Sequence, residues 1–240
     1  MNPSYRLFWG LFRLAFATYF RWRVHHPERV PLHEPVILAC NHASFLDPPL
    51  VGAGVKRPIN FLARESLFSV PIVGTLLRSW HVVPVDRDGG GGAGLKIILD
   101  RLRSGGVILL FPEGTRSRDG RLQAARPGIG LTVVKSTAPV IPVRVFNTDA
   151  AFGRGAWFPK PGRVIVKYGC PLLFADLRAE ARHCPKPRLK QIYQQTANEI
   201  MAAIAALEPN ADTPSSTRLE AFRSYFFFWQ NRKKPPGRGL

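Results

Sequence analysis

The hydrophobic positions of the 240-residue chain form short apolar runs that alternate with segments of helical spacing. Short apolar runs bounded by Gly, Pro or charged residues indicate buried strands, and apolar residues three or four positions apart indicate helices packed on a sheet. The strands expected are 36–40, 58–63, 82–85, 107–111, 140–145 and 163–168. The helices expected are 48–55, 70–79, 93–103, 128–137 and 187–207, and residues 147–162 are expected to form a loop. This alternation predicts an α/β fold with a central, mostly parallel sheet and crossover helices.

Residues 3–24 are apolar and aromatic but are interrupted by Arg6, Arg13, Arg21 and Arg23. The uninterrupted runs are far shorter than the roughly 20 residues of a transmembrane helix, and cations spread through the segment do not fit a signal peptide. On a helix, Arg6 and Arg13 lie almost in register, and aromatic side chains cover most of the remaining circumference. This pattern predicts an amphipathic helix at a membrane interface, with its arginines at lipid phosphates. The alternative is a helix docked on the protein's own core.

The composition of the two ends predicts a three-part organisation. Residues 1–28 are expected to form the membrane-associated segment, 29–208 the α/β domain, and 209–240 a linker with an aromatic and basic tail. The aromatic run 225–229 is followed by the cations 232–234, which suits a membrane interface as well as a solvated tail.

The charge balance narrows the class of partner. The chain has 34 Lys and Arg against 16 Asp and Glu, a net charge of +18. Such a balance favours an anionic partner, either nucleic acid, a phosphorylated substrate or an anionic membrane surface. Cys40, Cys170 and Cys184 are widely spaced without a C-x-x-C pair, which indicates neither a disulfide framework nor a zinc site and favours a reducing cytoplasm.

His42 and Asp47 directly follow the apolar run 36–40 and are the candidate catalytic pair. An imidazole can take a proton from a hydroxyl near neutral pH, and a carboxylate on its other nitrogen fixes the tautomer. On a straight helix five residues correspond to about 500°, so the two side chains can meet only across a turn. The prolines at 48 and 49 favour that turn, because the residue before a proline avoids helical geometry. The alternative is that Asp47 is only the N-cap of the next helix.

A second polar stretch, Phe111-Pro112-Glu113-Gly114-Thr115-Arg116-Ser117, directly follows the strand expected at 107–111. Glycine lets the backbone approach another group closely, and the arginine fork suits phosphate oxygens. Thr115 and Ser117 add hydroxyl donors, and Glu113 is expected to orient an arginine. The sequence therefore predicts an anion-binding loop, with an ordinary arginine-rich surface turn as the alternative.

These two blocks, together with Arg87 after an apolar strand and with Ile141-Pro142, resemble in residues and order the glycerolipid acyltransferase family, whose bacterial type acts on 1-acylglycerol-3-phosphate. The resemblance covers about residues 30–170. It implies that His42 is the base and Asp47 its orienting partner. It also implies an acceptor-phosphate site at Arg87, Glu113, Gly114, Thr115 and Arg116, and an acyl-donor side lined by Ile141 and Pro142.

The resemblance further implies the reaction, its substrates and its location. The expected activity is transfer of a fatty acyl group from acyl-CoA or acyl-carrier protein to the free hydroxyl of a lysophospholipid, which gives phosphatidic acid from 1-acylglycerol-3-phosphate. No metal or organic cofactor is expected. The expected location is the cytoplasmic face of the cell membrane, as a peripheral or monotopic protein on an anionic surface, with no nucleic acid as partner.

Three features keep alternatives open. The strand before Arg87 lacks the glycine and aromatic usual in the family, so another lysolipid or amphipathic acceptor is an alternative. Gly89, Gly91 and Gly94 match a dinucleotide fingerprint weakly, because consecutive glycines satisfy many patterns, and we interpret them as a flexible loop. The charge would also suit a nucleic-acid-binding protein, although the arginines are distributed and no helix-turn-helix, zinc-finger or RNP-type pattern is recognised. A non-catalytic membrane-binding protein is a third alternative, but it would not need His42 and Asp47.

Overall fold

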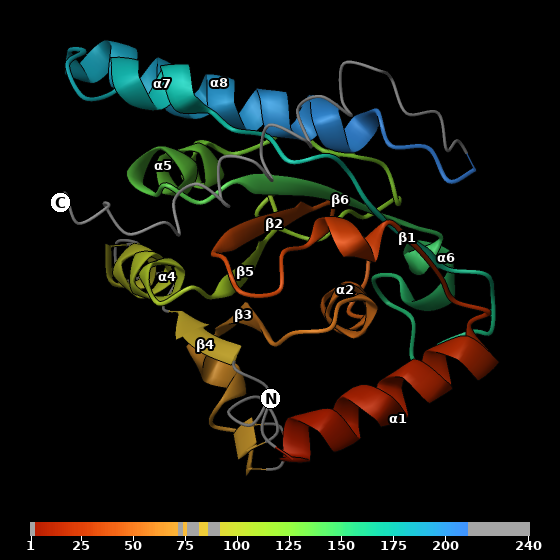
Figure 1. Cartoon of the computed structure of the whole chain (residues 1–240). Helices are drawn as coiled ribbons and strands as arrows, with labels where there is room; N and C mark the ends of the chain where they lie inside the picture. The colour runs from red at the N-terminus through yellow and green to blue at the C-terminus, as the bar shows by residue number, and fades with distance from the viewer. Residues whose placement is uncertain (1–2, 72–73, 76–81, 86–91, 211–240) are drawn as a thin grey trace, which may run out of the picture.

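Strand β2 (Val36–Cys40) lies at the centre of a seven-stranded sheet (Figure 1). The structure, a computed structural model, describes residues 3–71, 74–75, 82–85 and 92–210. Arg87, most of the helix expected at 70–79, the glycine loop through residue 91 and the tail from residue 211 lie outside these residues.

The sheet has the order β1-β7-β6-β2-β5-β3-β4 and is parallel except where β6 meets β7. The other strands are β1 (Arg23–His25), β3 (Ile59–Arg64), β4 (Val82–Val85), β5 (Val107–Leu110), β6 (Val140–Phe146) and β7 (Ile165–Tyr168). The helices are α1 (Pro3–Tyr19), α2 (Asp47–Gly54), α4 (Gly92–Arg103), α5 (Pro127–Lys135), α6 (Thr148–Phe152), α7 (Ala175–Glu180) and α8 (Lys186–Ala205). Short 3₁₀ turns occur at Pro27–Arg29 and Glu65–Leu67. The expected α/β fold with a mostly parallel sheet is confirmed.

Side chains of β2 alternate between two hydrophobic cores, one on each face of the sheet. Val36, Leu38 and Cys40 pack with residues of α1 and α2, whereas Ile37 and Ala39 pack with residues of α4, α5 and α8. All five β2 residues are fully buried, because β5 and β6 pair with β2 on both sides and helices cover both faces. This burial explains why β2 is a continuous apolar run.

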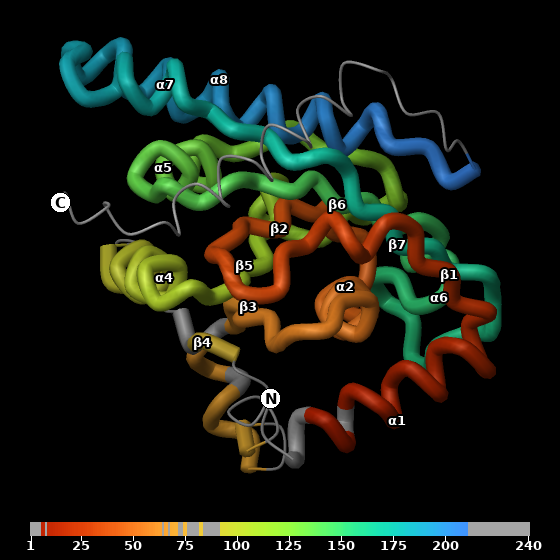
Figure 2. Tube along the Cα trace, viewed as in Figure 1, coloured from red at the N-terminus to blue at the C-terminus, as the bar shows by residue number. Residues whose placement is uncertain are grey.

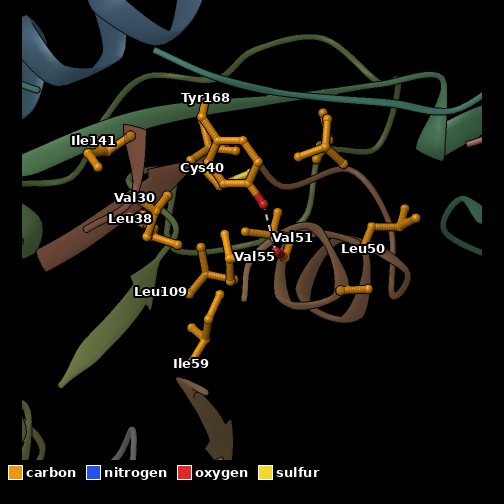
Figure 3. Packing of buried hydrophobic residues seen from close by; sticks show 14 of the residues in the cluster. Val30, Leu38, Cys40, Leu50, Val51, Val55, Ile59, Leu109, Ile141 and Tyr168 are labelled. Atoms are coloured by element: carbon orange, nitrogen blue, oxygen red, sulfur yellow. Dashed lines mark hydrogen bonds between the residues drawn. The ribbon is translucent and has the colours of Figure 1, made fainter. Parts of the chain in front are cut away.

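Tyr168 fixes α2 against the sheet. Its ring is fully buried in the core beside α2, and its hydroxyl donates a hydrogen bond of 2.7 Å to the Val51 carbonyl (Figure 3). This bond satisfies a carbonyl near the C-terminal end of a short helix, where backbone acceptors lack intrahelical partners. The helix that begins at Asp47 is therefore held rigidly at its far end.

Two short helices and one short strand were not expected from the sequence. The 147–162 segment, predicted as loop, contains α6, and α7 follows β7. Residues 23–25, predicted within the N-terminal helical segment, instead form β1, because the helix ends at Tyr19 and Arg21 reverses the chain at φ 44°. Elements this short have too few residues for a period to be recognised, and β1 exists only through its pairing with β7.

Helix α1 packs on the protein's own core, and the predicted orientation of its arginines is wrong for Arg13. Phe16 is almost fully buried, and Arg13 faces inward, where it donates a 2.7 Å hydrogen bond to the Ala53 carbonyl. The Arg13 guanidinium also lies 4.6 Å from the centre of the Trp9 ring. The solvent-facing side presents the exposed apolar residues Leu7, Leu11 and Leu14. Among the described helices, none is both long and apolar enough to cross a bilayer.

Candidate active site

The His42 and Asp47 side chains meet across the turn after β2. The Nδ1 atom of His42 lies 2.8 Å from Oδ2 of Asp47, and the carboxylate is fully buried while the His42 side chain is 17% exposed. A buried carboxylate held on one ring nitrogen leaves Nε2 as the nitrogen that can accept a proton. The predicted pair is therefore brought together in the geometry of a general base and its orienting partner.

Asp47 does not act as a helix N-cap. It is the first residue of α2, and its Oδ2 atom accepts 2.7 Å hydrogen bonds from the backbone N–H groups of Ala43 and Ser44 in the preceding turn. The cap position, Leu46, makes no side-chain cap hydrogen bond. One carboxylate oxygen thus closes the turn and holds the imidazole.

Asn41 fastens the same turn to the neighbouring strand. Its side chain accepts a hydrogen bond of 2.8 Å from the Val145 N–H and donates one of 3.2 Å to the Val145 carbonyl. This pair continues the β2–β6 ladder by one position beyond Cys40. Asn41 therefore fixes where the chain leaves the sheet, a structural role that the sequence did not reveal.

The Phe111–Ser117 loop after β5 packs directly on residues 41–47, the turn that carries the candidate catalytic pair (the catalytic turn). The Phe111 ring stacks on the His42 imidazole, with ring centres 3.8 Å apart and planes at 16°, and the Ser117 N–H donates a 2.8 Å hydrogen bond to the His42 carbonyl. Gly114 has φ +71°, and a Cβ atom there would lie 2.9 Å from Cδ of Arg126. Gly114 therefore provides the close approach that the sequence predicted, although the Ser117 hydroxyl donates to Asp119 rather than facing a ligand.

Glu113 supports the backbone of two separate segments. Its side chain is buried, and its carboxylate accepts hydrogen bonds from the backbone N–H groups of Gln123 and His42. Among the described residues it has no arginine partner, and the expectation that it orients an arginine stays a prediction, because Arg87 lies outside them. Burial raises the pKa of Glu113 to about 7, because desolvation outweighs the two backbone hydrogen bonds.

Arg116 is held beside the catalytic turn, where no carboxylate of the described residues pairs with it. Its guanidinium carbon lies 3.5 Å from the centre of the Phe45 ring, and its buried Nη1 atom has no hydrogen-bond partner among the described residues. Burial and, next, the positive charge of Arg154 lower the pKa of Arg116. A preorganised arginine with an unsatisfied donor suits an anion such as a phosphate.

A mainly apolar cavity of about 360 Å³ opens beside His42. Its walls come from β3, β5, α4, α5 and the Phe111–Gly114 segment. The apolar lining includes Leu62, Ile98, Leu109, Leu110 and Ile129, and Arg126 and Thr132 supply polar groups. An aliphatic chain fits such a lining, because apolar burial is its main source of binding free energy.

The remaining predicted site residues lie in three different settings. Thr115 is exposed beside Arg116, and Arg87 lies outside the described residues. Ile141 and Pro142 are buried within β6 opposite Leu38 and Ala39, and neither lines the cavity. The structure thus places the Ile-Pro block behind the catalytic turn.

Two cations near the site were not identified from the sequence. Arg126 borders the cavity at the start of α5, and Arg154 follows α6, which ends beside the catalytic turn. A hydrogen bond of 2.6 Å from Ser44 Oγ to the Phe152 carbonyl holds that end of α6 in place. The only sequence signal was the arginine itself, in a chain where arginine is common.

The functional groups are gathered where three neighbouring parallel strands end. His42 follows β2, Glu113 follows β5, and α6 follows β6, and these strands lie side by side in the sheet. Ligands of open parallel sheets bind at the carboxyl ends of the strands, because loops diverge there and leave a crevice. The fold therefore explains how blocks far apart in the sequence form one site.

Comparison with known proteins agrees with this arrangement. The profile of the family described as Acyltransferase matches residues 21–146. The chain is 26% identical over 155 residues to 1-acyl-sn-glycerol-3-phosphate acyltransferase of Bacillus subtilis, covering 64% of this chain and 75% of that one. It is 30% identical over 147 residues to a chloroplast enzyme of the same name from Arabidopsis thaliana, covering 60% of this chain and 41% of that one.

The fold is also that of a solved structure. The crystal structure of the 1-acyl-sn-glycerophosphate acyltransferase PlsC of Thermotoga maritima has a TM-score of 0.65 and 24% identity, over 85% of this chain and 80% of that one. The family match spans β1 to β6 and so includes both polar blocks that form the site. The chain belongs to the acyltransferase family.

Proposed function

We propose that the protein transfers a fatty acyl group from an acyl thioester to the free hydroxyl of 1-acyl-sn-glycerol-3-phosphate and so forms phosphatidic acid. The main observation in support is the 2.8 Å contact between His42 Nδ1 and Asp47 Oδ2, with His42 facing an apolar cavity and Arg116 nearby. The names of the relatives from Bacillus subtilis and Arabidopsis thaliana support the same acceptor.

In the proposed reaction His42 acts as general base. Nδ1–H donates to Asp47, and Nε2 removes the acceptor's hydroxyl proton as that oxygen attacks the thioester carbonyl. A carbon–oxygen bond forms, the tetrahedral intermediate collapses with cleavage of the carbon–sulfur bond, and the imidazolium returns its proton to the leaving thiolate. A general base typically contributes a factor of about 10² to 10⁴, so positioning of both substrates supplies the rest.

The acceptor phosphate is proposed to bind at the loop after β5. Arg116 would provide the main charge, with Thr115 and the Gly114 backbone beside it and with Arg87 as a second cation. Glu113 would act through the His42 backbone, to which its carboxylate is hydrogen-bonded. The cavity beside His42 would hold the acyl chain of either acyl-CoA or acyl-carrier protein, and no metal or organic cofactor takes part in the proposal.

We also propose that the protein works on the cytoplasmic face of a membrane, without nucleic acid as a partner. The net charge of +18 and the exposed leucines of α1 support binding to an anionic bilayer. The lipid acceptor would then reach the site from the surface on which the protein rests.

The test is acyl transfer from labelled palmitoyl-CoA and palmitoyl-acyl-carrier protein to a panel of lysophospholipids. We expect product with lysophosphatidate, a loss of at least about 10²-fold in His42→Ala, and normal rates in His183→Ala, a matched exposed histidine near the start of α8. Product only with another lysolipid would show that the proposed acceptor is wrong. Near-normal transfer by folded His42→Ala would refute the mechanism.

A further inference from the structure

The segment after α6 exposes two adjacent aromatic side chains. Trp157 is 92% exposed and Phe158 is 78% exposed, more than any other large hydrophobic side chain in the described part of the protein. Neighbouring aromatic side chains exposed to water indicate an interaction site, because removing their apolar surface from water is favourable. Trp and Phe are also suited to the boundary between lipid headgroups and acyl chains.

The structure holds these aromatics in a closed loop, residues 153–160. The Lys160 N–H donates a 2.7 Å hydrogen bond to the Ala151 carbonyl and closes the base of the loop. The Ala156 N–H donates to the Gly153 carbonyl at 3.2 Å, and Gly155 has φ +86°, which forms a tight turn just before Trp157. The two rings therefore project from a loop whose backbone is already fixed by hydrogen bonds, so little conformational entropy is lost when they bind.

The base of the loop is attached to the catalytic turn. Ser44 Oγ donates to the Phe152 carbonyl at 2.6 Å, and the Phe45 and Phe152 rings have centres 6.1 Å apart. Phe45 in turn supports the Arg116 guanidinium. Whatever the loop binds is consequently held next to the proposed phosphate site.

The far side of the loop is attached to α1. The Tyr19 hydroxyl donates a 2.9 Å hydrogen bond to the Pro159 carbonyl, so the loop reaches the C-terminal end of the helix (Figure 2). Leu7, Leu11 and Leu14 are 52–63% exposed on α1. The loop and the helix together thus offer two attached apolar elements to one partner.

The charged side chains of residues 150–163 are all positive. Residues 150–163 contain Arg154, Lys160 and Arg163 and no carboxylate, and these three side chains are exposed. Aromatics that enter the acyl boundary with cations beside them match an anionic phospholipid surface, where the cations meet the headgroup phosphates.

We propose that residues 153–160 form a membrane-inserting loop that docks the catalytic turn on an anionic phospholipid bilayer, with Trp157 and Phe158 as the inserted side chains. The inference rests on the proposed function only in that the acceptor is a membrane lipid. Binding of the loop to vesicles is a separate property and can be measured without acyl transfer.

The first test is sedimentation of the full-length protein with vesicles of phosphatidylcholine and phosphatidylglycerol. In the double variant Trp157→Ala/Phe158→Ala the two exposed side chains have little packing to lose, so the fold should be kept. The matched control is Leu32→Ala/Leu173→Ala, two exposed leucines at the other ends of the strands from the loop. Leu32 precedes β2, and Leu173 lies near the start of β6 because its neighbour Leu172 pairs with Val140. We expect about tenfold weaker binding in the aromatic variant and less than a twofold change in the control. Equal binding by the aromatic variant and the wild type would overturn the proposal.

The second test asks whether the indole ring of Trp157 enters the acyl-chain region of the bilayer. Vesicles with brominated acyl chains should quench part of the wild-type tryptophan fluorescence, and Trp157→Phe should remove that part. The acceptor is then supplied either in vesicles or as a short-chain monomer, and the aromatic variant should be slower only on vesicles. Equal losses on both would assign the loop to the active site instead, and a loss only with acyl-carrier protein as donor would make it a protein-docking surface.

A failure of the proposed function is separable from a failure of this inference. If the wild type transfers no acyl group but the aromatic variant loses vesicle binding, the loop assignment stands. If acyl transfer is normal and vesicle binding does not depend on the aromatics, only the loop assignment is refuted.

Discussion

Asp47→Asn tests what the buried carboxylate contributes beyond geometry. Oδ2 of Asp47 accepts hydrogen bonds from two backbone N–H groups and from the imidazole. In the variant the carbonyl oxygen of the asparagine must take that position, because an NH₂ group there would face hydrogen-bond donors. The amide oxygen would still accept from His42 Nδ1–H. The substitution therefore keeps the tautomer and the turn and removes the negative charge.

The contact between Asp47 and His42 determines how far kcat/KM is expected to fall. Two unit charges roughly 4 Å apart interact by about 4 kcal/mol at an effective dielectric constant near 20. The imidazolium is only partly formed in the transition state, so we expect kcat/KM to fall about 10²- to 10³-fold. The new NH₂ group would occupy the place of Oδ1, which is buried and has no hydrogen-bond partner in the described part of the chain, and should lower the free energy of unfolding by about 1–3 kcal/mol.

The assay combines acyl-transfer kinetics with denaturant unfolding of the same preparations. Asp176→Asn is the matched control, because Asp176 is exposed in the first turn of α7 and should change neither quantity. Asp47→Ala should destabilise the protein more than Asp47→Asn, since it leaves the N–H groups of Ala43 and Ser44 without their acceptor. An asparagine variant that is folded and keeps kcat/KM within about threefold would refute the proposed role of the charge.

Three further predictions concern the walls of the site and its support. Burial raises the pKa of Glu113 to about 7, so the carboxylate ionises more readily in the unfolded chain than in the folded one. The free energy of unfolding of the wild type should therefore fall relative to that of Glu113→Gln as the pH rises from about 4.5 to 7, by up to about 3 kcal/mol in paired unfolding experiments. Parallel plots of unfolding free energy against pH for the two proteins would contradict this. Ile129→Phe should fill part of the cavity and shift donor preference toward shorter acyl chains in a competition between chain lengths; an unchanged preference would remove the cavity from the donor site. Tyr168→Phe should lower the free energy of unfolding by about 1–3 kcal/mol, because the Val51 carbonyl loses its donor, while a change below about 0.5 kcal/mol would mean that water replaces it.

The central strands and the catalytic turn were predictable because their causes lie within a few residues. The run 36–40 is apolar throughout, and its burial on both faces follows from that pattern. Helix α2 begins at Asp47 with the two prolines in its first turn, where proline is favoured, so His42 and Asp47 meet across the preceding turn rather than along a helix. Local chemistry therefore determined this part of the site.

The inward face of α1 was not predictable for the opposite reason. Aromatic residues surround that helix on most sides, so the sequence does not select one face for the core. Arg13 is turned inward because the Ala53 carbonyl and the Trp22 ring are there, and both depend on where α2 and β1 lie. The same limit applies to Glu113, whose partners are backbone groups of two separate segments.

The proposed membrane attachment and the proposed catalysis are connected through α6, a short helix in a segment predicted as loop. Helix α6 ends at Phe152, where Ser44 of the catalytic turn is bonded, and the aromatic loop begins at the next residue. A rigid connection of this kind allows a surface-bound acceptor to be presented at a fixed height relative to His42, because the loop and the turn cannot move independently without losing that bond. Loosening the bond with Ser44→Ala should therefore slow transfer to acceptor in vesicles more than transfer to a monomeric acceptor, and equal slowing of both reactions would show that Ser44 serves only the local turn.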